Sequence, residues 1–141
     1  YNDAVKDPQK ANLIAKVISQ IDSNLILLGG PNSQMQKAAC VYALTFIAEG
    51  FIDRRYTDDG HLLSRAEKGA VLATDAERIA QALSLAQTQT VKTDSGQILR
   101  LNAQSLCLHG DSQGAVLTAQ KARAALETAG VTIQAFATHG V

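Results

Sequence analysis

Short, almost continuous apolar runs alternate along this sequence with amphipathic helical segments, and this alternation is the feature that most restricts the fold. The clearest run is residues 25–28 (LILL), which ends at the Gly-Gly-Pro of residues 29–31. A strand that is apolar on both faces is typical of a parallel sheet covered by helices. The order of the elements therefore predicts βα units and an α/β fold with a mostly parallel sheet.

Apolar side chains recur three and four positions apart in four segments, which are predicted to be helices. These segments are residues 8–21, 33–45, 75–88 and 112–129. Residues typical of helix starts and helix ends flank several of these segments. Asp7 precedes a proline that fits the first helical position. Thr74 and Glu77 have the spacing of a capping box, and Gly130 fits the position just after the last helix.

Four apolar runs are predicted to be strands: residues 25–28, 46–52, 106–108 and 131–136. Residues 90–101 predict a hairpin that turns at residues 94–96. The polar loop at residues 57–70 is longer than most structural loops, which makes it a candidate for function. Without repeats or linkers, residues 1–141 are predicted to form a single domain, and the tail at residues 137–141 is expected to be loosely ordered.

Charge and composition argue against several classes of protein. Thirteen basic residues balance thirteen acidic ones, whereas binding to nucleic acid through its phosphates needs a basic excess. No apolar run approaches the roughly 20 residues that span a bilayer, and the polar N-terminus lacks the basic region of a signal peptide. Cys40 and Cys107 form neither a disulfide framework nor a zinc signature, and they are interpreted as buried free thiols. The prediction is a cytoplasmic protein without nucleic-acid or membrane partners.

Ligands of parallel α/β sheets bind at the carboxyl ends of the strands, and the first polar cluster at such an end is residues 108–111 (LHGD). His109 can carry a proton near neutral pH. Asp111 can project into a pocket or cap the following helix. The residues alone fit a catalytic pair and also a cap aspartate beside a structural histidine.

The second polar cluster, residues 49–56 (EGFIDRRY), follows an apolar run. The alternation of a strand places Glu49 and Asp53 on one side and Arg54 on the other. A carboxylate beside an arginine can bind an amino-acid-like substrate, or it can form a salt bridge at a solvated strand end. The long polar loop that follows could fold over this site, where Arg65 could hold a carboxylate or a phosphate in bidentate fashion.

The third candidate, residues 29–33 (GGPNS), could present backbone N–H groups to an anion. It has neither a GxGxxG pattern nor a Walker lysine, so it is interpreted as a plain turn. His61 and His139 are interpreted as solvated loop residues. With no HExxH, CxxC or GxSxG motif, no metal site is predicted.

Three ordered stretches resemble the LamB/YcsF family, named for lactam utilisation and identified with the A subunit of 5-oxoprolinase. Residues 49–56 resemble the family segment E-x-F-A-D-R-x-Y, with Ile52 where alanine is usual. Residues 59–65 (DGHLLSR) are similar to the family stretch D-G-x-L-V-x-R, with Ser64 where proline is usual. Residues 105–111 (SLCLHGD) match the family segment S-x-C-x-H-G-D.

The resemblance implies both a fold and a reaction. The implied fold is an incomplete, distorted (β/α) barrel, TIM-barrel-like and similar in shape to polysaccharide deacetylases. The implied reaction is hydrolysis of a cyclic amide, in which 5-oxo-L-proline is opened to L-glutamate while ATP, with Mg²⁺, is hydrolysed to ADP and phosphate. A nucleotide-binding site and two partner subunits, B and C, are therefore expected of the complex.

The resemblance also suggests roles at the matching positions. His109 is predicted to be an acid/base or polar substrate contact, and Asp111 is predicted to orient it or to cap the following helix. The candidates for binding substrate or phosphate are Glu49, Asp53, Arg54 and Arg65. Arg54 or Arg65 is predicted to hold a carboxylate or phosphate, and Glu49 and Asp53 are predicted to shape the pocket. Because the family motifs upstream of these stretches are absent, the chain by itself is expected to be inactive. The alternatives are a non-catalytic small-molecule-binding or scaffold domain, and a deacetylase-like metal-dependent hydrolase with ligands upstream.

Overall fold

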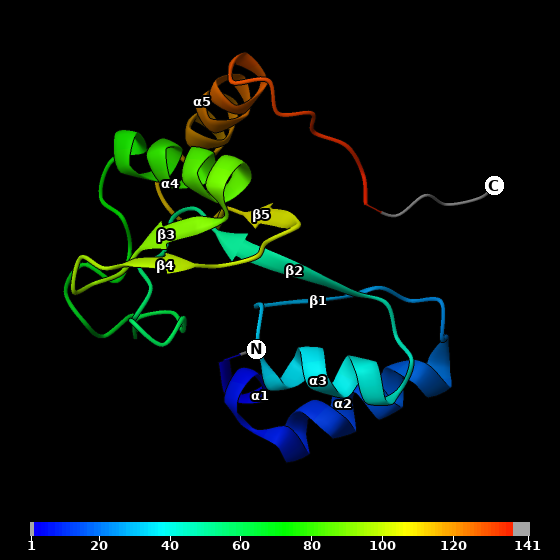
Figure 1. Ribbon diagram of the computed structural model, residues 1–141. Coiled ribbons are helices and arrows are strands. Elements are labelled where there is room, and N and C mark those ends of the chain that lie inside the picture. The colour runs from blue at the N-terminus through cyan, green and yellow to red at the C-terminus, as the bar shows by residue number, and fades with distance from the viewer. Residues whose placement is uncertain (1, 137–141) are drawn as a thin grey trace. The chain divides into compact units, whose positions relative to one another are not determined.

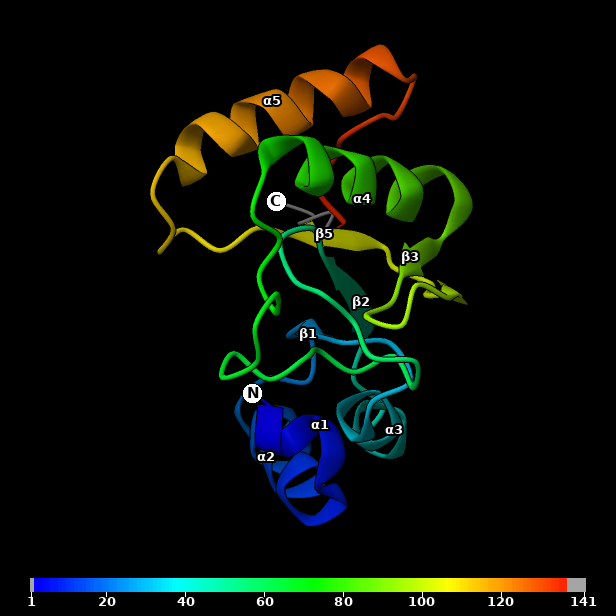
Figure 2. The ribbon, with the colours of Figure 1, turned by 90° about the vertical axis from the view of Figure 1, so that its left-hand side faces the viewer.

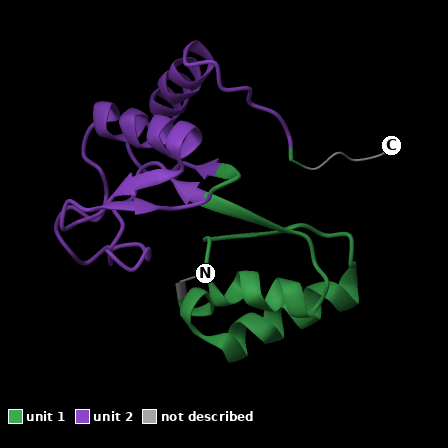
Figure 3. Ribbon diagram, viewed as in Figure 1, with its two compact units in different colours: residues 1–49, 103–105, 136–141 green, residues 50–102, 106–135 purple. Residues whose placement is uncertain are grey.

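The structure is a computed structural model that describes residues 2–136 (Figure 1). These residues divide into two compact units (Figure 3). The first unit takes residues 2–49, 103–105 and 136, and the second takes residues 50–102 and 106–135. The single domain predicted for the whole chain stays a prediction. The tail from residue 137 onward, with His139, lies outside the described residues.

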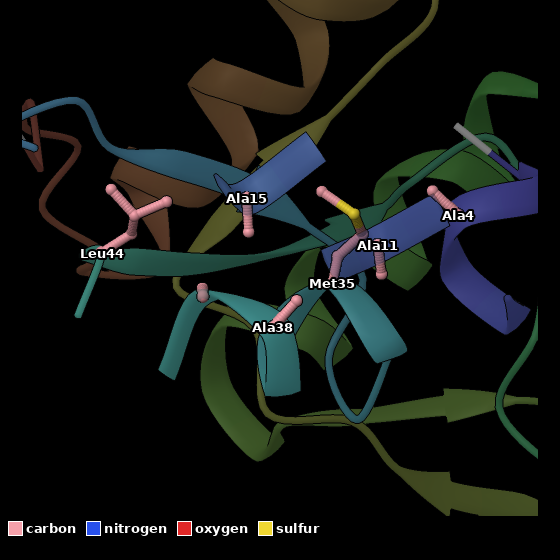
Figure 4. Close-up of a cluster of buried hydrophobic side chains, with 7 residues drawn as sticks. Ala4, Ala11, Ala15, Met35, Ala38 and Leu44 are labelled. Atoms are coloured by element: carbon pink, nitrogen blue, oxygen red, sulfur yellow. The ribbon is translucent and has the colours of Figure 1, made fainter. Parts of the chain in front are cut away.

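Three helices build the first unit: α1 (Asn2–Lys6), α2 (Pro8–Ile21) and α3 (Gln34–Val41). The predicted start of α2 is confirmed, because the Asp7 side chain accepts hydrogen bonds from the backbone N–H groups of Gln9 and Lys10. Small side chains let the helices approach closely. Their core consists of Ala4, Ala11, Ala15, Met35, Ala38, Ala39 and Leu44 (Figure 4).

A three-stranded sheet has the order β1 (Leu27–Gly29), β2 (Phe46–Phe51), β5 (Ser105–Cys107). Strands β1 and β2 run parallel, with Gly29 opposite Ala48. A Cβ at Gly29 would lie 3.2 Å from the Phe46 ring, so the glycine permits this close approach. The parallel pairing of strands β1 and β2, in a chain where strands alternate with helices, confirms the predicted α/β class. The barrel and its likeness to deacetylases stay predictions.

Helices α4 (Asp75–Thr88) and α5 (Ala115–Thr128) pack side by side in the second unit (Figure 2). The capping box of Thr74 and Glu77 forms as predicted. Strands β3 (Thr90–Lys92) and β4 (Ile98–Arg100) make the predicted antiparallel hairpin. Its turn needs Gly96, whose φ is +91°, a conformation that glycine adopts without strain.

The predicted strand at residues 131–136 is wrong. These residues have no regular structure and are mostly exposed, although the segment is apolar. A strand needs a neighbour that accepts its backbone hydrogen bonds, and composition does not reveal whether one is present. The predicted helix at residues 33–45 is also too long. Its last turn ends at Val41, and Ala43 has a φ of +53°.

Burial of the cysteines differs from the prediction. Cys40 is an exposed free thiol, and Cys107 is a half-buried free thiol. Cys40 lies on the solvent side of α3, since the buried positions of that helix are Met35, Ala38 and Ala39. Across the described part of the chain, the helices are all too short or too polar to cross a membrane.

Candidate active site

Strand β2 ends at Phe51 and is followed by a tight, buried turn that carries two charged residues. Asp53 is 2% exposed and Arg54 is 3% exposed. The backbone is held on two sides, because Ile52 N–H donates to the Cys107 carbonyl and Leu72 N–H donates to the Asp53 carbonyl, each at 2.9 Å. A carboxylate buried to this degree needs hydrogen-bonding partners to offset its lost hydration.

The partner of the Asp53 carboxylate is His109, which follows strand β5. The His109 ring nitrogen Nδ1 lies 3.0 Å from Asp53 Oδ1 and 2.9 Å from Oδ2. The backbone N–H of His109 also donates to Oδ2, at 3.3 Å. An ionised carboxylate accepts hydrogen bonds only, so a neutral His109 ring carries its proton on Nδ1. The other ring nitrogen, Nε2, is then the one that can accept a proton.

Stacking on Phe51 limits the motion of the His109 ring, while the side chain stays partly exposed. The ring stacks on Phe51, with centroids 5.4 Å apart and an angle of 20° between the planes. The His109 side chain is 26% exposed, whereas that of Asp53 is 3% exposed. The histidine therefore has one buried side held by a carboxylate and one side that solvent reaches. This is the arrangement of a general acid/base oriented by a second group.

A second charged pair joins the long loop to the turn after β5. Arg65 Nη1 lies 3.1 Å from Asp111 Oδ2, and the two side chains are 51% and 64% exposed. The hydrogen bond from Arg65 is the main cause that holds the pKa of the Asp111 carboxyl below its ordinary value, and the charge of His109 lowers that pKa further. The pair thus belongs to the same electrostatic environment as His109.

Asp111 does not cap the following helix. Helix α5 begins at Ala115, its N-cap is Gly114, and no side chain makes a capping hydrogen bond there. The interpretation of Asp111 as a helix cap is therefore wrong. The carboxylate that hydrogen-bonds to the His109 ring is that of Asp53, whereas Asp111 accepts a hydrogen bond from Arg65. The segment between Asp111 and α5 carries one side-chain hydroxyl, that of Ser112, which is buried and has no hydrogen-bonding partner among the described residues.

The Arg54 side chain hydrogen-bonds to the backbone of the long loop. Its Nε donates to the Ala70 carbonyl at 3.2 Å, and its Nη2 donates to the Leu63 carbonyl at 2.7 Å. Burial is the largest cause that lowers the pKa of Arg54, and the charge of Arg65 adds to it. The sequence left open whether Arg54 or Arg65 holds a ligand. The geometry favours Arg65, because its guanidinium is half exposed.

The remaining candidate residues are not members of the Asp53–His109 or Arg65–Asp111 pairs. Glu49 is a half-buried residue of β2 in the first unit, so its role in a pocket stays a prediction. The turn at residues 29–33 is also in the first unit, where Asn32 N–H donates to Gln36 Oε1 at 2.7 Å. His61 Nε2 lies 3.7 Å from Asp59. Within residues 2–136, no three His, Cys, Asp or Glu side chains gather closely enough to hold a metal ion.

Sequence reasoning missed Gln81. Its side-chain amide Nε2 donates to the Phe51 carbonyl at 2.8 Å and to the Arg54 carbonyl at 2.7 Å. A usable signal was present, because Gln81 stands between the apolar positions Ile79 and Ala82 of a predicted amphipathic helix. A polar residue beside a buried face needs a partner.

Fold and site together define an α/β protein with an Asp–His pair and an Arg–Asp pair after the carboxyl ends of two sheet strands. Comparison with known proteins agrees with this class. The model of the LamB/YcsF family matches residues 1–140, and the chain belongs to that family.

Named relatives add detail. The chain is 41% identical to the 5-oxoprolinase A subunit numbered 1 of Agrobacterium fabrum, over 97% of this chain and 54% of the relative. It is 40% identical to the 5-oxoprolinase A subunit of Tolumonas auensis, over 96% and 54%. The crystal structure of the lactam utilization protein from Thermus thermophilus superposes with a TM-score of 0.87 and 29% identity, over 95% of this chain and 53% of that one. The chain thus spans about half the length of these relatives.

Proposed function

We propose that this chain carries part of the site at which a 5-oxoprolinase complex opens 5-oxo-L-proline to L-glutamate. The relatives named as A subunits of 5-oxoprolinase support this assignment. The structural observation that carries it is the Asp53–His109 pair, which orients one ring nitrogen of a partly exposed histidine for proton transfer.

The chemistry of the substrate fits the two charged pairs. A lactam is an unreactive amide, and phosphorylation of its carbonyl oxygen by ATP would give a better electrophile and a better leaving group. Water must then attack the carbonyl carbon. His109 Nε2 would take a proton from that water and return one to the lactam nitrogen as the C–N bond breaks, which leaves an acyl phosphate. A second water would then hydrolyse the acyl phosphate to L-glutamate and phosphate.

Arg65 is the proposed contact for the carboxylate of 5-oxo-L-proline or for a phosphate. One of its nitrogens already donates to Asp111, at 3.1 Å. A guanidinium has five N–H donors, so further donors remain for a bidentate contact with an anion. Asp111 would then hold the arginine in place while the ligand binds.

The relatives are named as one lettered subunit of an enzyme, which implies an assembly of several subunits. We infer that partner subunits B and C complete the catalytic site and that ATP with Mg²⁺ is the co-substrate of the complex. On this view the chain alone is inactive.

The test uses a chimera in which this chain replaces the matching 138-residue segment of the Agrobacterium fabrum relative, supplied with the partner subunits of that organism. Phosphate release that depends on 5-oxo-L-proline is measured. His109→Gln is expected to lower turnover by about 100-fold or more, the range in which general acid–base catalysis contributes. The matched control, His61→Gln, is expected to stay within about twofold of the parent chimera, since His61 lies outside the proposed machinery.

Two outcomes would count against the proposal. Equal turnover of His109→Gln and the parent chimera would remove the histidine from the mechanism. Turnover by this chain in the absence of the partner subunits would contradict the expected inactivity of the chain alone.

A further inference from the structure

We propose that Gln81 of α4 is a positioning residue that sets the Asp53 carboxylate against His109. The inference concerns the orientation of the Asp53–His109 pair, and only its consequence for catalysis rests on the proposed function. The Gln81 side chain hydrogen-bonds to the backbone of the turn that carries Asp53. It acts on the pair through that backbone.

The Gln81 amide spans this turn. Its two hydrogen bonds reach the carbonyls of Phe51 and Arg54, at 2.8 and 2.7 Å. These two residues flank Asp53 on either side. An amide nitrogen has two hydrogens, so both donors of Gln81 are used on one turn. The residue is 9% exposed, so water has little access to replace the bonds if they are lost.

A second side chain on the same face of α4, that of Arg78, also connects this helix to the turn. Arg78 lies three residues before Gln81, a spacing that places both on one side of a helix. Arg78 Nε donates to the Leu72 carbonyl at 3.0 Å. The Leu72 N–H in turn donates to the Asp53 carbonyl at 2.9 Å. The backbone on both sides of Asp53, and that of Asp53 itself, is therefore tied to α4.

The position of the turn decides whether the carboxylate reaches the histidine. Asp53 and His109 are 56 positions apart in the sequence, and their contact at 2.9 Å is close to the ideal hydrogen-bonding distance. A hydrogen bond to a charged group loses strength steeply as the geometry departs from that distance. If the Phe51–Arg54 turn relaxes by even about 1 Å, the Nδ1–H tautomer of His109 loses its advantage.

A buried glutamine that merely satisfied two carbonyls would support stability alone, so the test needs a readout that stability does not move. We use the tautomer of His109, measured by ¹⁵N NMR on chain labelled at histidine nitrogen, at a pH well above the ordinary histidine range. In the parent chain we expect the Nδ1–H tautomer. In Gln81→Met, which keeps the side-chain length without the donors, we expect the ratio of Nδ1–H to Nε2–H to fall about tenfold, which corresponds to about 1.4 kcal/mol.

Leu85→Val is the matched control, because Leu85 is a fully buried apolar residue of the same helix. It destabilises the packing of α4 and should leave the tautomer ratio unchanged. An unchanged ratio in folded Gln81→Met overturns the inference, and so does an equal change in Leu85→Val. If Gln81→Met does not fold, the tautomer ratio of His109 is measured in Gln81→Asn instead. Asparagine keeps the amide donors on a stem too short to reach both carbonyls, so the ratio should fall part of the way, and no fall rejects the inference.

The tautomer measurement needs no substrate, so it separates this inference from the proposed function. In the chimera described above, Gln81→Met should lower kcat with little change in KM, since the substrate contacts remain. A changed tautomer with unchanged turnover leaves Gln81 as a positioning residue and rejects the catalytic role of His109. An unchanged tautomer rejects the positioning role whatever the turnover is.

Discussion

Replacement of Arg54 by methionine tests the interpretation that this residue braces the long loop. The guanidinium is 3% exposed and donates to the carbonyls of Leu63 and Ala70. Methionine keeps an unbranched apolar stem and removes both donors. The variant therefore removes the arginine donor from the Leu63 carbonyl and from the Ala70 carbonyl, of which the second keeps the hydrogen bond from Arg55 N–H at 2.9 Å.

The magnitude follows from these two bonds. Hydrogen bonds to charged groups contribute about 1.5–3 kcal/mol each to stability. Part of that loss is offset, because burial of the charged guanidinium has a desolvation cost that is absent in the methionine variant. The expected net loss is about 3 kcal/mol, a large share of the roughly 5–15 kcal/mol that stabilises a domain.

Urea unfolding followed by circular dichroism gives the change in the free energy of unfolding, and hydrogen exchange at the Leu63 and Ala70 peptide groups locates it. Arg123→Met is the matched control. Arg123 is 60% exposed and pairs with Glu127 one helical turn away, at 2.9 Å, so its loss should cost no more than about 0.5 kcal/mol. A loss below about 1 kcal/mol for Arg54→Met would refute the bracing role.

Three further predictions concern other parts of the chain. Arg65→Met should raise the pKa of Asp111, because the hydrogen bond from Arg65 lowers it. Folding lowers the pKa of Asp111, so the ion pair stabilises the fold at pH values above 3.8, the ordinary pKa of the carboxyl. This stabilisation is lost as the pH falls through the lowered pKa of the folded state. NMR of the Asp111 carboxyl measures the pKa in both proteins, and an unchanged pKa in Arg65→Met would contradict the prediction. Thr74→Ala should cost about 1 kcal/mol through loss of the helix cap, and identical urea midpoints would argue against the cap. Cys40 should react with a maleimide before Cys107, because Cys40 is the exposed thiol; peptide mass spectrometry that finds Cys107 labelled first would reverse this ranking.

Helices and hairpins could be predicted from the sequence where residues within the same segment determine them. The predicted helices at residues 8–21 and 75–88 coincide with the bounds of α2 and α4. Each has a periodic apolar face and a capping side chain within a few residues of its start, so the neighbouring sequence contains most of the information. The hairpin at residues 90–101 formed for a similar reason, since its turn is marked by Gly96. The strand predicted at residues 131–136 failed because pairing depends on a distant partner.

The sequence by itself placed His109 and Asp53 in two polar clusters and Arg65 in the long polar loop, and by resemblance it placed all three in motifs of one family. Only the tertiary structure decided that the first two meet, that Arg65 pairs with Asp111, and that Arg54 faces the backbone. Residue type and spacing report what a chain segment can form with its own neighbours. Which charge is buried against which partner depends on packing across tens of residues, because a buried carboxylate is tolerated only where the folded chain supplies its hydrogen bonds.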